Sequence, residues 1–238
     1  MTRNRRGIIV HPEELRLDWL DRMAEARLNT LGLHPVGGRE AHLTLQKAID
    51  MHTLPESIKL RAAAASRGIS VEYEAHVMAW LLPRHLFDQH PDWFRMDDRG
   101  QRAADFNLCA SNQNALDYVA QRTATLATLL DTGANKHYYW LDDVTGHHCN
   151  CPDCRSLSPS DQQLIVVNAM LSGLKHVDKN AKLCYLAYHD ALQVPARVEP
   201  LDGVFLEYAP IRRDHRAPIN APNNEKNAQE VAPLKDLI

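Results

Sequence analysis

The sequence has 238 residues, of which 45% are hydrophobic and 24% charged, the composition of a globular protein with one sizeable core. The formal net charge of -3 and the scattered arginines provide no basic surface, which excludes nucleic acid as an expected partner. No apolar run approaches the roughly 20 residues that span a bilayer, so no membrane partner is expected either. The first residues contain too short an apolar run for a signal peptide, which predicts a cytoplasmic location, or a secreted or periplasmic one if the chain is trimmed.

Short apolar segments alternate with amphipathic helical segments, and this alternation predicts an α/β fold with a parallel sheet. Six strands are expected, at residues 7–11, 30–35, 69–77, 137–143, 181–189 and 203–209. Helices are expected within 12–29 and 57–68, from near Asn112, from Ser160 to about residue 177, and near the end of the chain.

The order of elements is typical of a (β/α)8 TIM-type barrel that forms a single domain over residues 1–238. A closed barrel needs eight strands and six are visible, so we expect a barrel that lacks its last strands. An exposed sheet edge would favour a homo-oligomer.

Alternation along the strands assigns side chains to two faces. The outer face of such a barrel is covered by helices and must be apolar, so the polar positions are expected to point inward. The inward residues are His34, Glu72, Glu74, His76 and Glu207. The fourth strand ends in Asp142 and Asp143, which face opposite ways, and alternation does not choose between them.

Four motifs follow one another between His76 and Pro210. They are His76 with Leu81-Leu82-Pro83 and His90-Pro91-Asp92-Trp93-Phe94; Leu108-Cys109 with Ser111-Asn112; Asp143 with Cys149-Asn150-Cys151-Pro152-Asp153-Cys154; and Leu186-Ala187-Tyr188 with Tyr208-Ala209-Pro210. In these motifs the chain, from about residue 60 to 213, resembles a large uncharacterised bacterial family of glycoside-hydrolase-like barrels. That family is related in fold to alpha-glucuronidases and hexosaminidases.

Two features depart from the family pattern. Asp142 stands where the family usually has asparagine, which makes Asp143 the better candidate for the shared role. The family's elements beyond the sixth strand have no expected counterpart in this sequence.

The resemblance implies a glycoside hydrolase that acts on a poly- or oligosaccharide and requires no cofactor. Such enzymes use two carboxyl groups, one of which donates a proton. We expect Asp143, as proton donor, and Glu207 to form this pair, with Asp142 as a further catalytic candidate. A variant mechanism in which a substrate acetamido group acts as nucleophile is also open. The expected sugar-binding residues are His34, Glu74, His76, Trp93, Trp140 and Tyr208.

Three cysteines lie close together after the fourth strand. With His148 or its neighbour His147, Cys149, Cys151 and Cys154 offer enough soft ligands for a tetrahedral zinc that would hold this loop. Reduced thiols packed beneath the site are the alternative. A third interpretation of the whole chain is a carbohydrate-binding barrel without activity, since a fold does not dictate a function.

Overall fold

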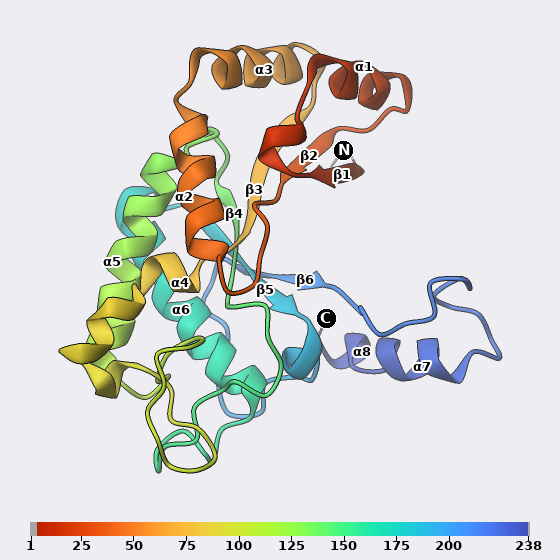
Figure 1. The fold of residues 1–238 in the computed structure, drawn as a ribbon. Coiled ribbons are helices and arrows are strands. Elements are labelled where there is room, and N and C mark those ends of the chain that lie inside the picture. Colours follow the sequence, from red (N-terminus) through yellow and green to blue (C-terminus); the bar gives the residue numbers. More distant parts are fainter. Residues whose placement is uncertain (1–3, 238) are drawn as a thin grey trace.

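A single six-stranded parallel sheet organises the computed structural model, which describes residues 4–237 (Figure 1). The strands are β1 (Gly7–Val10), β2 (Thr30–Leu33), β3 (Ser70–His76), β4 (Lys136–Trp140), β5 (Lys182–Ala187) and β6 (Val204–Tyr208). They pair in the order β1-β2-β3-β4-β5-β6, and every pair is parallel. The α/β TIM-type fold is therefore confirmed, and within the described residues the sheet is open rather than closed into a barrel.

The helices before β6 lie in the connections between the strands, and the last two follow β6. They are η1 (Pro12–Glu14), α1 (Leu17–Glu25), α2 (Ala41–His52), α3 (Pro55–Ser66), α4 (Met78–Leu81), η2 (Arg84–Asp88), η3 (Pro91–Trp93), α5 (Gln113–Leu129), α6 (Pro159–Val177), η4 (His189–Ala191), α7 (Glu225–Val231) and α8 (Leu234–Leu237). Figure 1 shows α2, α5 and α6 on one side of the sheet, whereas α7 and α8 extend beyond β6.

Helices α2 and α6 show how the observed helices differ from the predicted ones. No helix was expected over α2, although Leu45, Ala48, Ile49 and His52 are buried at helical spacing. Helix α6 begins earlier than expected because Ser158, not Ser160, is its N-cap; the Ser158 side chain accepts a hydrogen bond from the Asp161 backbone N–H.

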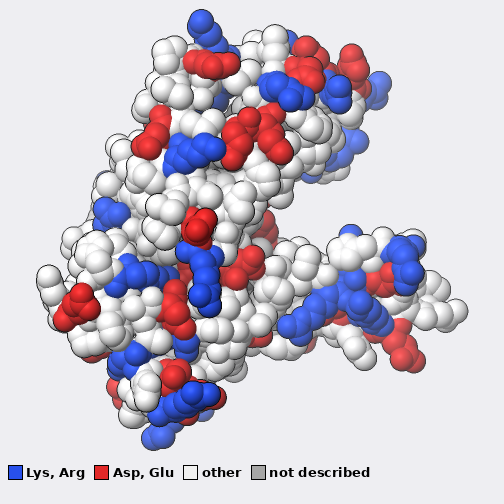
Figure 2. All heavy atoms as spheres, viewed as in Figure 1, with Lys and Arg blue, Asp and Glu red and all other residues white. Residues whose placement is uncertain are grey.

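The two faces of the sheet have different partners. One face buries apolar side chains, such as Leu31, Val71 and Ala75, in the main core beneath the helices. The opposite face, here called the inner face, carries the small apolar cluster of Tyr138, Trp140 and Cys184. Figure 2 shows the molecule in the same view as Figure 1. A wide hollow lies between the part that contains β1 and the part that contains α7, on the side away from α2 and α5.

The pairing between β4 and β5 is short. Only Lys136 with Lys182 and His137 with Leu183 are in register, so the two strands separate toward their carboxyl ends. A cavity of about 70 Å³ opens there, lined by residues that include Leu141, Leu186 and Tyr188. The sheet thus provides space at the strand ends, where parallel α/β proteins usually bind ligands.

Candidate functional site

Three histidines at the carboxyl ends of β1, β2 and β3 join neighbouring strands. The Nδ1–H groups of His11, His34 and His76 donate to the carbonyl oxygens of His34, Glu74 and Leu141, at 2.7, 2.7 and 2.6 Å. We call these three residues the histidine chain. Because each Nδ1 is bound to backbone, each Nε2 is left as the ring atom available to a ligand.

Trp140 connects the histidine chain to β6. Its ring centroid lies 5.5 Å from that of His34 and 5.1 Å from that of His76. Its indole Nε1 donates to Glu207 Oε2 at 2.8 Å. Glu207 is therefore on the inner face, and burial raises its pKa above the ordinary value.

Glu74 lies beside Glu207 on the inner face. The Glu74 carboxyl group packs directly against the backbone of Gly32 in β2. A Cβ on Gly32 would lie 2.2 Å from Glu74 Oε1, so this contact requires glycine. Burial, together with the nearby carboxyls of Glu207 and Glu72, raises the pKa of Glu74 to about 8. Glu72 itself is held by an ion pair with Arg5 at the opposite end of the strands. At neutral pH Glu74 is thus a neutral acid that can donate a hydrogen bond.

The adjacent aspartates after β4 have different environments. The Asp142 side chain is 2% exposed and its Oδ2 accepts hydrogen bonds from Arg84 Nη2 at 2.5 Å and from the Asn107 backbone N–H at 2.6 Å. The Asp143 side chain is 38% exposed, with its Oδ1 at 3.2 Å from the Tyr188 hydroxyl and 3.9 Å from His189 Nε2. Asp142 therefore binds the long β3–α5 connection, whereas Asp143 is open to a ligand.

The cavity between β4 and β5 adjoins these groups. His76, Asp142, Tyr188 and His189 all line it. The His148 and His189 Nδ1 atoms are buried and have no hydrogen-bond partner among residues 4–237. Buried polar nitrogens usually bind a protein group or a water, so both are available to a small polar ligand here.

Two predicted sugar-binding residues lie apart from this group. Trp93 stacks on His90 with a centroid distance of 4.1 Å and also contacts Tyr118 of α5, so its ring packs in the β3–α5 connection. The Tyr208 hydroxyl donates to the backbone carbonyl of Glu230 in α7. The structure brings together His34, Glu74, His76, Trp140, Asp143 and Glu207, and it places Trp93 and Tyr208 in contacts with other elements.

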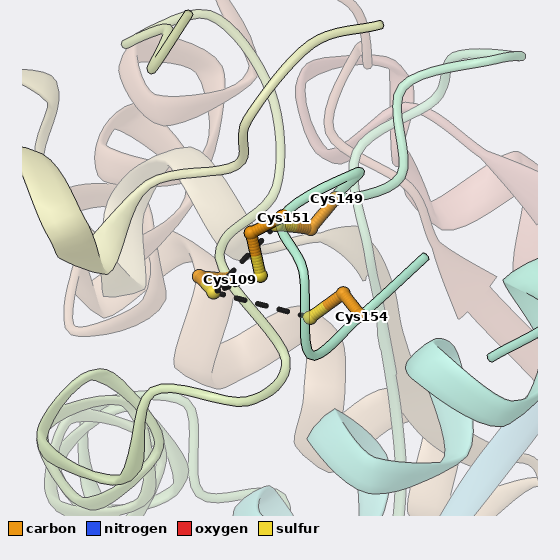
Figure 3. A group of neighbouring side chains, drawn as sticks. All are labelled: Cys109, Cys149, Cys151 and Cys154. Carbon is orange, nitrogen blue, oxygen red and sulfur yellow. Dashed lines mark hydrogen bonds between the residues drawn. The ribbon is translucent and has the colours of Figure 1, made fainter. Parts of the chain in front are cut away.

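Four cysteines form a separate buried group behind the strand ends. The sulfur atoms of Cys109, Cys149, Cys151 and Cys154 all lie within 4.8 Å of one another, and Figure 3 shows them converging from two segments of the chain. The Cys109 sulfur lies within hydrogen-bonding distance of the sulfur atoms of the other three cysteines. A metal ion fits this donor set. The fourth member is Cys109 rather than the expected His148.

Sequence reasoning missed Cys109, Tyr188, Arg84 and Asn107. Cys109 belongs to one of the quoted motifs, but it precedes the cysteine loop by 40 residues, and only the folded connection brings it there. Tyr188 also belongs to a quoted motif at a strand end, which was the available signal. No signal in the sequence indicates that Arg84 and Asn107 meet Asp142.

Residues 40–235 match a family described as "Domain of unknown function (DUF4838)". The chain belongs to this family. No curated protein matches the DUF4838 chain. None of its described helices has the length and apolar character needed to cross a membrane.

Among solved structures, a β-N-acetylhexosaminidase from Bacteroides fragilis is similar, with a TM-score of 0.51, 16% identity and coverage of 85% of this chain and 45% of that one. An α-galactosidase from Lactobacillus brevis has a TM-score of 0.44 at 13% identity and covers 76% of this chain and 26% of that one. An α-galactosidase from Thermus thermophilus has a TM-score of 0.41 at 18% identity, covering 77% and 38%. The DUF4838 chain shares its fold with part of the hexosaminidase and spans less than half the length of each of these proteins.

Proposed function

We propose that this chain carries the active face of a glycoside hydrolase that acts on a poly- or oligosaccharide. One observation carries the proposal. Glu74 and Glu207 lie on the inner face, and Asp143 and the histidine chain lie at the strand ends beside them. Carboxyl groups are rarely placed inside such a sheet without a partner or a task. The fold shared with the hexosaminidase agrees with this proposal.

Asp143 is the proposed proton donor to the leaving-group oxygen. Its side chain is 38% exposed, so a substrate can reach it, and the Tyr188 hydroxyl 3.2 Å away fixes its orientation. Asp142, a catalytic candidate in the sequence, instead has its carboxylate committed to Arg84 and Asn107. We therefore assign Asp142 a positioning role for the loop that carries Asp143.

Glu207 is the proposed second carboxyl group. Trp140 donates a hydrogen bond to its Oε2, and the Cys184 thiol is a further hydrogen-bond partner of the carboxyl group. The neutral Glu74 and the Nε2 atoms of His34 and His76 would bind sugar hydroxyls, and the Trp140 edge would line the same surface. This chemistry uses carboxyl groups and water and needs no metal.

A substrate with an acetamido group could supply its own nucleophile in place of Glu207. In that case Asp143 still donates the proton, but replacement of Glu207 leaves most of the turnover intact. The two variants Asp143→Asn and Glu207→Gln therefore separate the two mechanisms.

The test is a hydrolysis screen of the purified chain against aryl glycosides, uronides and N-acetylhexosaminides. We expect turnover with at least one class, and a fall of about 10²- to 10⁴-fold in kcat for Asp143→Asn, the usual contribution of a general acid. Asp202→Asn, an exposed carboxylate in the turn before β6, is the matched control and should keep full activity. Sugar binding without any turnover would contradict the proposal and favour a non-catalytic binding barrel.

A further inference from the structure

Four thiols meet in the DUF4838 chain at spacings that suit one metal ion. The Cys109 sulfur lies 3.6 Å from that of Cys149, 3.7 Å from that of Cys151 and 3.9 Å from that of Cys154. A tetrahedral zinc with Zn–S bonds of about 2.3 Å requires sulfur atoms about 3.8 Å apart. We propose that Cys109, Cys149, Cys151 and Cys154 bind a single structural zinc ion.

Other chemistry fits these distances less well. A disulfide requires sulfur atoms about 2.05 Å apart, and all five cysteines of the chain are free. In an iron–sulfur cluster, iron and inorganic sulfide stand between the thiolates and hold them further apart than one shared ion does. Four protein thiolates complete a tetrahedral shell and leave no position for water, so the metal is structural rather than catalytic.

Polar groups around the cysteines favour thiolates. The Met96 backbone N–H donates to the Cys149 sulfur at 3.3 Å, and Arg102 Nη1 lies 3.8 Å from the same atom. The Ser111 hydroxyl lies 3.3 Å from the Cys109 sulfur and 3.5 Å from the Cys151 sulfur. Four thiolates and one Zn²⁺ carry a net charge of -2, which the Arg102 guanidinium partly offsets.

The backbone around the group is fixed from outside. The Gln162 side chain in α6 accepts from the Cys149 N–H at 2.9 Å and donates to the Cys149 and Cys154 carbonyls at 3.0 and 3.2 Å. The Cys109 N–H donates to the Trp93 carbonyl at 2.8 Å. These bonds hold the ligand-bearing segments in place, as the surroundings of protein metal sites commonly do.

The zinc would join the two connections that flank the candidate active site. Cys109 follows Asn107, which binds Asp142 through both its backbone N–H and its side chain. The other three cysteines follow Asp143 in the β4–α6 connection. Loss of the metal should therefore loosen the loops that present both aspartates.

The first experiment measures metal content of the full chain by plasma mass spectrometry after dialysis. We expect about one zinc per chain in the wild type, loss of that zinc in Cys151→Ser, and retention in Cys184→Ser. Cys184 is the matched control because it is a buried thiol in β5 outside the group. Zinc retained by Cys151→Ser would overturn the proposal. A wild-type chain that contains no metal although all five of its thiols are reduced would also overturn it.

A second experiment uses the wild type alone, in case Cys151→Ser does not fold. The chain is prepared with Co²⁺ in place of zinc, and its visible absorption should show the intense bands of tetrahedral tetrathiolate cobalt. Thiols are then counted in denaturant with a chelator, where five are expected. Weak octahedral cobalt bands, or fewer than five thiols because disulfides have formed, would overturn the proposal.

Discussion

The adjacent residues Asp142 and Asp143 have similar positions in the sequence but different environments in the structure. Alternation along β4 could not choose between them, and the resemblance to a family favoured Asp143. In the structure Arg84 and Asn107 bind the Asp142 carboxylate, which supports the proposed role of Asp143. Both partners come from the long β3–α5 connection, whose path depends on tertiary contacts that no local pattern encodes.

The carboxyl group of Glu74 should make stability depend on pH. Its folded pKa of about 8 exceeds its ordinary value of 4.5, so the folded chain keeps a proton that the unfolded chain releases. The free energy of unfolding should therefore fall as the pH rises between these two values, by up to about 1.4 kcal/mol per pH unit. Glu74→Gln keeps a neutral side chain and should flatten this fall in urea unfolding measured from pH 5 to about 8.

The exposed Glu25 at the end of α1 is the control for this prediction. Glu25→Gln should leave the pH dependence of the wild type unchanged. If the Glu74→Gln variant loses stability with pH as steeply as the wild type, the raised pKa of Glu74 is wrong.

The strands were predictable because each is a short apolar segment, and all six expected strands are present. Helix α2 was missed although Leu45 and Ile49 carry its apolar pattern. The contact between α5 and α6 could not be foreseen, since it depends on one small residue. A Cβ on Gly173 in α6 would lie 2.0 Å from the Ala120 carbonyl oxygen in α5.

Gly173→Ala should therefore destabilise the protein. Alanine favours a helix over glycine by about 1 kcal/mol, but the clash is with backbone that cannot rotate away, and overpacking costs about 1–3 kcal/mol. Urea unfolding should show a net loss of stability. Ser172→Ala, an exposed neighbour in the same helix, is the control and should change stability little. A Gly173→Ala variant more stable than the wild type would show that α5 and α6 are not in close contact.

At the scale of the whole molecule, the order of the six strands follows the order of the sequence, so the alternating pattern was enough to predict the sheet. The open sheet was also predicted, because six strands are too few for a closed barrel of eight. Within residues 4–237, β1 and β6 each pair with one neighbour only. Most of β1 is exposed or half-buried and all of β6 is half-buried, whereas β3 is buried over six of its seven residues.

Hydrogen exchange should follow this gradient across the sheet. Backbone amides of β3 should exchange slowest, and those of β1 and β6 fastest, because local opening costs least where few buried contacts hold a strand. Exchange followed by mass spectrometry on the isolated chain measures this directly. Equal protection of β1, β3 and β6 would indicate that both outer strands are covered in solution, as in an oligomer.

The histidine chain has a consequence for how the sheet assembles. Each of the three bonds from His11, His34 and His76 exists only if its strand is aligned correctly with the next one. A slip by one residue would turn the side chains to the opposite face and break the bond at that strand end. Two of these residues, His34 and His76, are also proposed to bind the substrate. Selection for activity and selection for correct strand alignment would then act on the same two side chains.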